Sequence, residues 1–205
     1  MAISSAYHKT RADILEEEQV IAAAKRDPKH FEPLYRSYYE PIFRFVYKRL
    51  DSMDQAQDVT SQVFLKALTN LKKYQSRGLP FGSWLYRIAI SEVNNMYKAN
   101  KATRALNIDT VNLNHMMQEM EEDQSEEHRQ LLVQGLRHLK EEDLALVEMR
   151  FFEKRPFKEI GEILGITENN AKVRLYRALD RLKKTVTTTD QPQAGNGQEN
   201  NKTTR

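Results

Sequence analysis

The stretch EIGEILGITENNAKVRLYRAL, from Glu159 to Leu179, joins two helix-forming runs through a Gly-Ile-Thr turn. Gly165 suits the left-handed residue that ends a helix, and Thr167 can accept a hydrogen bond at the start of the next one. Ile160 and Leu164 place an apolar stripe on the first run. Two helices joined by a short turn that contains Gly form a helix-turn-helix. The stretch therefore predicts a helical hairpin, and its second helix decides what the hairpin does.

That second helix, predicted from Thr167 to about Thr185, has two chemically different faces. An α-helix turns by 100° per residue, so one face is apolar and faces a core. The apolar residues are Ala171, Leu175, Ala178, Leu179 and Leu182. The opposite, mostly basic face carries Asn169, Lys172, Val173, Tyr176, Arg177, Asp180, Lys183 and Lys184. Such a helix can enter the major groove of duplex DNA. An ordinary hairpin with a basic outer face is the alternative interpretation.

The composition favours an all-α protein that works inside the cell. Of 205 residues, 40% are hydrophobic and 30% are charged, while only 7 are Gly and 6 are Pro. The absence of Cys excludes a disulfide framework, a thiol nucleophile and a Cys-ligated metal. No apolar run approaches the length of a membrane span, and the N-terminus does not resemble a secretion signal. We expect a cytoplasmic protein without membrane insertion.

Charge is segregated along the chain, although the net charge is only +3. Residues 72–104 carry seven bases against Glu92, and residues 167–184 carry six bases against two acids. Between these basic blocks, residues 105–128 carry seven acids and no Lys or Arg. A basic block alone is often a solvated face, but two blocks on either side of an acidic connector favour a polyanion as partner.

Helical periodicity divides the chain into two domains. Residues 12–102 contain four predicted helices, 12–25, 31–50, 55–71 and 83–100, with Ser83 as the predicted N-cap of the last. Residues 103–125 read as a flexible acidic linker. Residues 126–186 form a second, small helical domain, and residues 187–205 read as a disordered tail. The predicted fold class is all-α, with two small helical domains joined by a flexible linker.

Two blocks of the sequence resemble a known family. LRHLKEEDLALVEMRFFEKRPFKEIGEILGITENNAKVRLYRALDRLK looks like region 4 of bacterial RNA polymerase sigma factors. FEPLYRSYYEPIFRFVYKRLDSMDQAQDVTSQVFLKALTNLKKY, followed by FGSWLYRIA, looks like region 2. With only a short linker between them, the chain resembles the extracytoplasmic-function (ECF, group IV) class. The resemblance implies core RNA polymerase and promoter DNA as partners, and an anti-sigma factor, although nothing in the sequence marks a docking site for the latter.

The resemblance also implies which residues meet DNA. The residues matched to those that read the −35 duplex are Asn169, Asn170, Lys172, Val173, Tyr176 and Arg177. The residues matched to those near the −10 element are Arg77, Trp84, Arg87, Ser91, Asn94 and Lys98. Four of the latter, spaced from Arg87 to Lys98, form a polar stripe that suits a single strand, whose phosphates need cations and whose bases need partners. Trp84 could stack on a base or be buried at the helix start.

Contacts with the polymerase are expected on the helix from Asp58 to Leu68, at Asp58, Ser61, Gln62 and Leu65. The family usually has a Gln-Glu pair where this chain has Ser61-Gln62. By resemblance, the acidic linker threads toward the polymerase active site, and a solvated spacer is the alternative.

The predicted function is promoter-specific transcription initiation after recruitment to core polymerase, without covalent chemistry. A stand-alone helix-turn-helix regulator is the alternative. An enzyme has little support, because the five His show no metal-ligand spacing and no Gly-rich phosphate loop is present. We therefore predict no catalytic residue, no metal, no cofactor and no small-molecule substrate.

Overall fold

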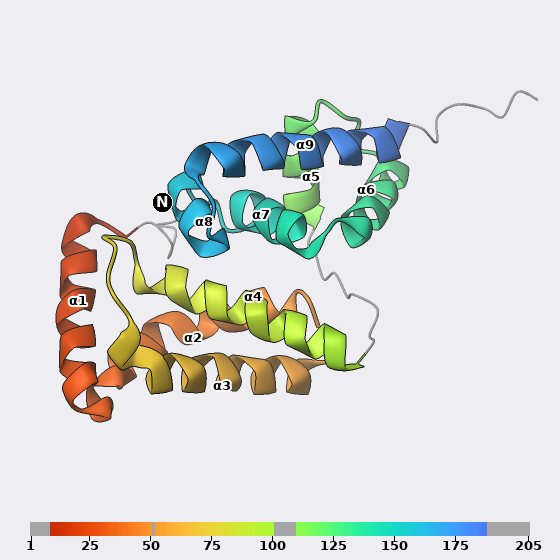
Figure 1. The fold of residues 1–205 in the computed structure, drawn as a ribbon. Helices are drawn as coiled ribbons and strands as arrows, with labels where there is room; N and C mark the ends of the chain where they lie inside the picture. Colours follow the sequence, from red (N-terminus) through yellow and green to blue (C-terminus); the bar gives the residue numbers. More distant parts are fainter. Residues whose placement is uncertain (1–8, 51, 101–109, 188–205) are drawn as a thin grey trace, which may run out of the picture.

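The computed structural model describes residues 9–50, 52–100 and 110–187, and every regular element in these ranges is a helix. The helices form two groups that lie one above the other (Figure 1). The first group holds the N-terminal helices and the second holds those that follow residue 109. The predicted all-α class with two helical domains is confirmed.

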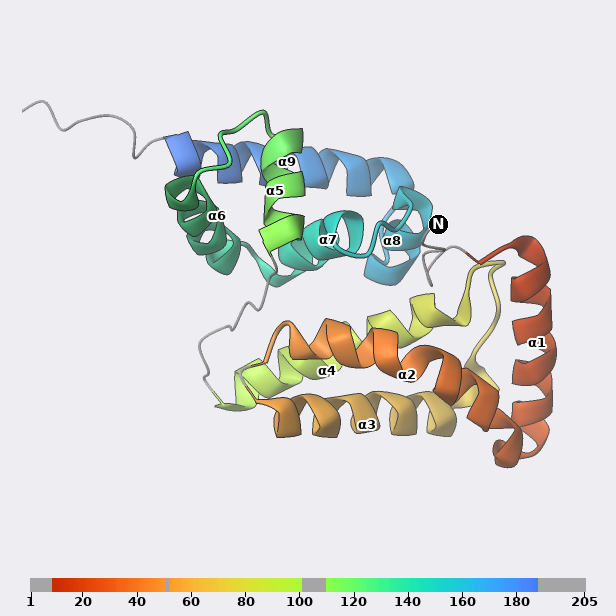
Figure 2. The same ribbon diagram turned by 180° about the vertical axis from the view of Figure 1, so that it is seen from behind.

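The first group consists of α1 (Arg11–Arg26), α2 (Glu32–Tyr47), α3 (Met53–Asn70) and α4 (Phe81–Asn100). Two short 3₁₀ helices, η1 (Pro28–Phe31) and η2 (Leu71–Lys73), adjoin α2 and α3. Helices α2, α3 and α4 pack side by side, and α1 crosses one end of them (Figures 1 and 2). Helix α2 runs on through Pro41 and lies within the helix predicted over residues 31–50. Its apolar stripe of Leu34, Tyr38, Ile42 and Phe45 is buried in the core.

The start of α4 differs from the prediction. The helix begins at Phe81, so Ser83 lies inside its first turn and is not the N-cap. A long-range contact replaces the local cap, because the backbone N–H of Phe81 donates to Glu17 Oε2 on α1 at 3.0 Å. The other carboxylate oxygen of Glu17, which is buried, accepts from the hydroxyl of Tyr38 at 2.5 Å. Burial and the neighbouring Glu17 carboxylate raise the pKa of Tyr38, so this hydroxyl stays a donor.

The second group consists of α5 (Thr110–Glu119), α6 (Glu126–His138), α7 (Glu141–Phe151), α8 (Phe157–Leu164) and α9 (Glu168–Thr187). Helix α7 is almost entirely buried among the others, and α9 lies across α6, α7 and α8. Helices α6 to α9 together span residues 126–187, close to the range 126–186 predicted for the second domain, and α9 starts one residue after its predicted start. No helix in the described ranges is both long enough and apolar enough to cross a membrane.

The linker prediction is wrong for the part that the structure describes. Residues 110–119 form α5, which packs against α6 and α7. Leu113, Met116, Met117 and Met120 are buried, and their spacing of three, four and seven residues is that of one helix face. The acidic residues from Glu119 to Asp123 make this segment look like a solvated linker, although the apolar face is present in the sequence. Residues 103–109 of the predicted linker and residues 188–205 of the predicted tail lie outside the described residues.

Candidate nucleic-acid and polymerase interfaces

The turn between α8 and α9 has the geometry predicted for a helix-turn-helix. Gly165 adopts φ 70° and ψ 30°, and the hydroxyl of Thr167 accepts from the backbone N–H of Asn170 at 3.2 Å. A Cβ added to Gly161 would lie 2.7 Å from the carbonyl oxygen of Ile166, so a side chain there would push the turn away from α8. The two glycines set the angle at which α9 leaves the turn.

Five of the six residues predicted to read the −35 duplex are exposed along the outer side of α9. They are Asn169, Asn170, Val173, Tyr176 and Arg177, with Tyr176 57% exposed. The sixth, Lys172, is partly buried and pairs with Glu168 at 2.7 Å. Amides, a phenol, an apolar side chain and a guanidinium on one helix face can contact both base edges and phosphates.

Two of the basic residues on α9 have a different role. Arg174 and Arg181 bond the carboxylate of Asp143 on α7, at 2.8 Å and 2.7 Å. Burial alone would raise the pKa of Asp143, but these hydrogen bonds outweigh it and leave the pKa below the usual value. Both arginines thus fix α9 against α7. The basic face predicted for this helix already left out Arg174 and Arg181, but only the packing of α7 shows that they bond Asp143.

Four of the six residues predicted to contact the −10 element line one pocket of about 600 Å³ beside α4. They are Arg77, Trp84, Arg87 and Ser91. Asn94 and Lys98 lie further along α4 and do not line it. Trp84 is partly buried against Tyr74, with ring centres 4.8 Å apart, and forms part of the pocket wall.

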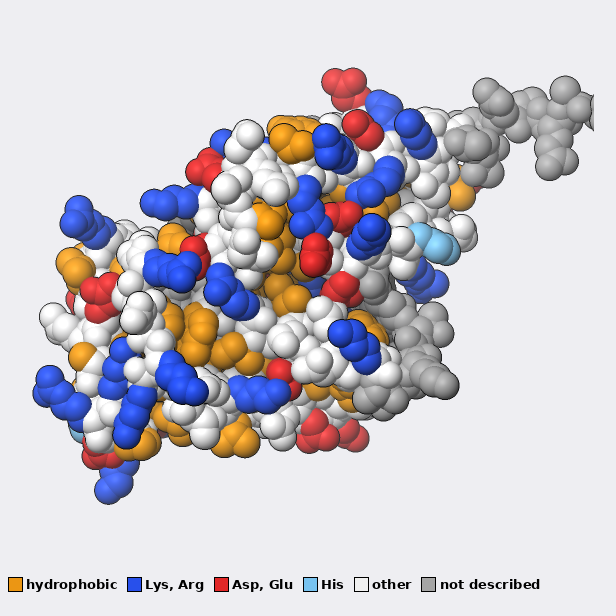
Figure 3. All heavy atoms as spheres, in the orientation of Figure 1, with side chains coloured by type: hydrophobic (Ala, Val, Ile, Leu, Met, Phe, Trp, Pro, Cys, Tyr) orange, Lys and Arg blue, Asp and Glu red, His pale blue; other side chains and the backbone are white. Residues whose placement is uncertain are grey.

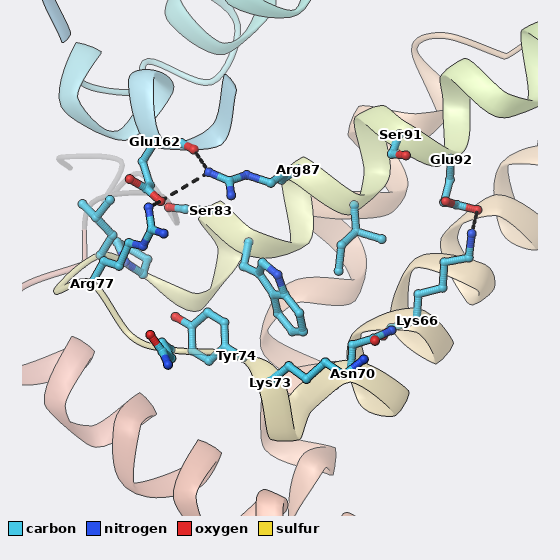
Figure 4. A pocket seen from close by; sticks show the side chains of 15 residues that line it. Lys66, Asn70, Lys73, Tyr74, Arg77, Ser83, Arg87, Ser91, Glu92 and Glu162 are labelled. Atoms are coloured by element: carbon cyan, nitrogen blue, oxygen red, sulfur yellow. Dashed lines mark hydrogen bonds and ion pairs between the residues drawn. The ribbon is translucent and has the colours of Figure 1, made fainter. Parts of the chain in front are cut away.

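The pocket also contains residues that the sequence did not single out (Figure 4). Lys66 and Asn70 come from α3 and Lys73 from η2, so the opposite wall is basic and polar too. Lys66 is held by Glu92 of α4 at 2.7 Å. Only the packing of α3 on α4 brings these residues together. An aromatic wall with cations on both sides suits an unpaired base and its phosphates.

The four residues predicted to contact polymerase are exposed on α3. Ser61, Gln62 and Leu65 lie three, four and seven residues after Asp58, the spacing of one helix face, and Leu65 is 56% exposed. Phe64 belongs to the core and Leu68 is partly buried against it. All four side chains are therefore accessible to a partner.

The described residues contain no group of three or more His, Asp or Glu side chains that could hold a metal ion. Lys and Arg side chains lie on both helical groups on the face shown in Figure 3.

Comparison with known proteins decides the family. The Sigma-70 region 2 model matches residues 34–103, and the Sigma-70 region 4 model matches residues 135–184. The chain is 29% identical over 162 residues to the RNA polymerase sigma factor YlaC of Bacillus subtilis, covering 76% of this chain and 91% of that protein. It is 28% identical over 172 residues to the ECF sigma factor BldN of Streptomyces coelicolor, covering 80% of this chain and 63% of that one.

This chain belongs to the ECF class of sigma-70 factors. Its function is to bind core RNA polymerase and direct promoter-specific transcription initiation. A solved complex of RsbN with BldN is also similar, with 24% sequence identity and a TM-score of 0.35, covering 80% of this chain and 97% of that one. Neither family match extends to α1 or α5, so both helices lie outside the regions defined by the family.

Regions 2 and 4 of this sigma factor touch through α4 and α8. Arg87 of α4 donates through Nε to the carbonyl oxygen of Ile163 at 3.2 Å, and through Nη2 to that of Glu162. The hydroxyl of Ser83 donates to Glu159 Oε1 at 3.0 Å, in a buried position. Residues predicted to meet the −10 strand therefore also meet region 4.

Two buried arginines complete the contact between the regions. Arg155 pairs with Glu159 and, at 2.8 Å, with Glu153, and its guanidinium lies 3.9 Å from the ring centre of Tyr86 on α4. Arg49, at the end of α2, pairs with Glu148 of α7. Its guanidinium carbon is 3.7 Å from the ring centre of Phe45. The contact between the regions thus includes a buried ion pair, a buried hydrogen bond and an arginine packed on an aromatic ring.

Proposed function

We propose that the exposed face of α9 reads the −35 duplex, that the pocket beside α4 holds the unpaired −10 strand, and that the exposed face of α3 docks on core polymerase. The observation that carries the proposal is the separation of these surfaces. Each surface is built mainly on a different helix, α9, α4 or α3, and Trp84, which packs against the core, forms one wall of the pocket. A tether between the two regions makes the second DNA contact intramolecular once the first is made, so neither region needs high affinity.

The −35 assignment is supported by the position of Arg177 relative to the turn. Arg177 lies on the same face as Asn169 and Val173, two turns after the first and one turn after the second. In a recognition helix the first turns contact base edges, and a guanidinium beyond them meets a phosphate or a guanine. The first turns of α9 should therefore determine sequence preference, and Arg177 should contribute mainly affinity.

Run-off transcription with purified core polymerase on a pool of genomic fragments tests the function directly. We expect specific start sites only when both the chain and core polymerase are present. A stand-alone helix-turn-helix regulator would instead bind its duplex tightly without core polymerase and would direct no start-site selection. That result would contradict the proposal.

The polymerase surface is tested by the double variant Asp58→Ala with Gln62→Ala. Both side chains are exposed, so helicity should not change, whereas association with core polymerase should weaken. Replacing Glu32 and Arg36, an exposed pair on α2, gives a control at a similar level of exposure. If immobilised core polymerase retains as much of the double variant as of the parent chain, this surface does not bind polymerase.

The proposal includes action without catalysis and in the cytoplasm, where core polymerase and promoter DNA are found. It also includes an anti-sigma partner, which rests on the family resemblance. Purification of the chain from its source under low salt, with identification of any protein bound in equal amount, tests this part.

A further inference from the structure

One acidic side chain of region 4 closes the pocket that we assign to the −10 strand. The carboxylate of Glu162, on α8, lines this pocket together with Arg77 and Arg87 (Figure 4). Glu162 Oε1 lies 2.8 Å from Arg77 Nη1 and 3.3 Å from Arg87 Nη2. Two guanidinium groups from region 2 thus converge on one oxygen atom from region 4.

The chemistry of this contact is that of a phosphate site. Guanidinium groups bind carboxylate and phosphate oxygens with the same planar N–H donors. Arg77, in the loop before α4, and Arg87, on α4, approach the same carboxylate oxygen from two different segments. A phosphate of the unpaired strand would use the same donors, so Glu162 and the strand compete for them.

The C-terminal end of α8 strengthens the competition. Arg87 donates to the carbonyl oxygens of Glu162 and Ile163, which lie in the last turn of that helix. A helix C-terminus carries a partial negative charge, which a cation satisfies. With three acceptors on α8, the guanidinium of Arg87 has few donors left for DNA.

Buried contacts keep α8 in this position. Ser83 donates to Glu159, one turn before Glu162 on α8, and Arg155 covers the ring of Tyr86. The outer face of α9 takes no part in the closure, since Val173 and Tyr176 are 40% and 57% exposed. The contact therefore blocks the −10 surface and leaves the −35 surface accessible.

We infer that the free chain is held closed by Glu162, which occupies the phosphate-binding pair Arg77–Arg87 until region 4 moves away. This inference rests on the proposed function of the pocket. Docking of region 2 on polymerase and binding of α9 to its duplex would then separate the regions and release both arginines. The closed chain can search duplex DNA through α9 without engaging single strands.

The chain offers a direct test because it has no Cys. Gln57 on α3 and Gln130 on α6 are exposed and lie away from the contact, so both can be changed to Cys and spin-labelled. Double electron–electron resonance then reports the distance between the regions. Glu162→Lys places a cation beside two arginines and should replace one narrow distance distribution with a broader, longer one. Glu127→Lys, an equal charge change on α6, should leave the distribution unchanged.

The second readout is binding of a fluorescent, random-sequence single-stranded 20-mer at low salt without polymerase. Glu162→Gln removes the competing charge and keeps the side-chain size, and it should bind the oligonucleotide about five-fold more tightly than the parent chain, the effect of losing two partly exposed ion pairs. Glu127→Gln provides the matched control. Circular dichroism shows whether each variant is folded, and Glu162→Gln remains informative should Glu162→Lys not fold.

The outcomes separate this inference from the proposed function. Unchanged distances and unchanged oligonucleotide binding in both Glu162 variants, with start-site selection by the parent chain intact, would overturn the closure and leave the function standing. Failure of the parent chain to select start sites with core polymerase would overturn the function. Longer distances and tighter oligonucleotide binding in Glu162 variants that still select the same start sites would support both.

Discussion

Replacing Glu148 with Leu should lower the free energy of unfolding by about 3 kcal/mol, because Arg49 then stays buried without its closest partner. Arg49 is fully buried and Glu148 is only 2% exposed, yet one belongs to region 2 and the other to region 4. Removing one member of a buried ion pair typically costs about 3–5 kcal/mol. Glu141, whose Oε1 lies 3.6 Å from Arg49 Nε, retains part of the attraction and places the loss at the lower end.

A double-mutant cycle isolates the pair. Arg49→Met with Glu148→Leu removes both charges and fills a similar volume, so it should unfold within about 1 kcal/mol of the parent chain. The coupling between the two positions would then be about 2 kcal/mol or more. Urea unfolding at pH 8, followed by circular dichroism, gives the four free energies.

An exposed pair provides the control for this cycle. Glu32 and Arg36 on α2 lie 2.6 Å apart but are both more than half exposed, so Glu32→Leu should change stability by no more than about 0.5 kcal/mol. Additive effects at Arg49 and Glu148, with a coupling under about 0.5 kcal/mol, would refute the conclusion that the two regions share a buried ion pair.

Burial raises the pKa of Glu148 to about 7, although the positive charge of Arg49 lowers it in part. The folded chain therefore keeps a proton on Glu148 at pH values where the unfolded chain, with the ordinary pKa of 4.5, has released it. The stability that this proton gives is fully present below pH 4.5 and is lost as the pH rises through 7, by at most about 1.4 kcal/mol per pH unit. Urea unfolding from pH 5 to pH 8 should show that Glu148→Gln flattens the dependence of the free energy of unfolding on pH. Gly165→Ala should cost about 1 kcal/mol, since its φ of 70° strains Ala while the added Cβ meets no atom within 4 Å; an unchanged melting curve would contradict this. Gly161→Ala should cost more than Gly165→Ala, because its Cβ would strike a backbone oxygen at 2.7 Å. Arg177→Ala should weaken duplex binding and reduce the salt slope by about one, and an unchanged −35 footprint would count against a DNA contact there.

The local features of the fold could be predicted because their causes lie within a few residues of one another. Gly165 and Thr167 mark the turn through backbone conformation and capping, and neither depends on distant parts of the chain. The apolar face of α9 follows from a spacing that any helix must have. The exposed positions on α3 and α9 follow from the same spacing, since whatever is not turned to the core faces solvent.

The features that depend on packing could not be predicted. Ser is a residue type that often caps helices, which is why the sequence predicts Ser83 as the cap. In the structure, Glu17 on α1 instead accepts the hydrogen bond of the Phe81 backbone N–H at the start of α4. The partner of Arg174 is also set by packing, because Asp143 of α7 lies opposite it. The apolar face of α5 is visible in the sequence, because Leu113, Met116, Met117 and Met120 have helical spacing. Treating these Met residues as core residues predicts the helix.

The docking of α5 on region 4 determines how far the two regions can move apart. With α5 in place, only residues 101–109 connect Asn100 to Thr110, and a chain of that length spans at most about 35 Å. Release of α5 would extend the connection to Glu126 and more than double its reach. A short connection raises the effective concentration of each region near the other, and a long one lowers it. The four apolar side chains that hold α5 in place therefore influence which spacings between promoter elements a single molecule can bridge.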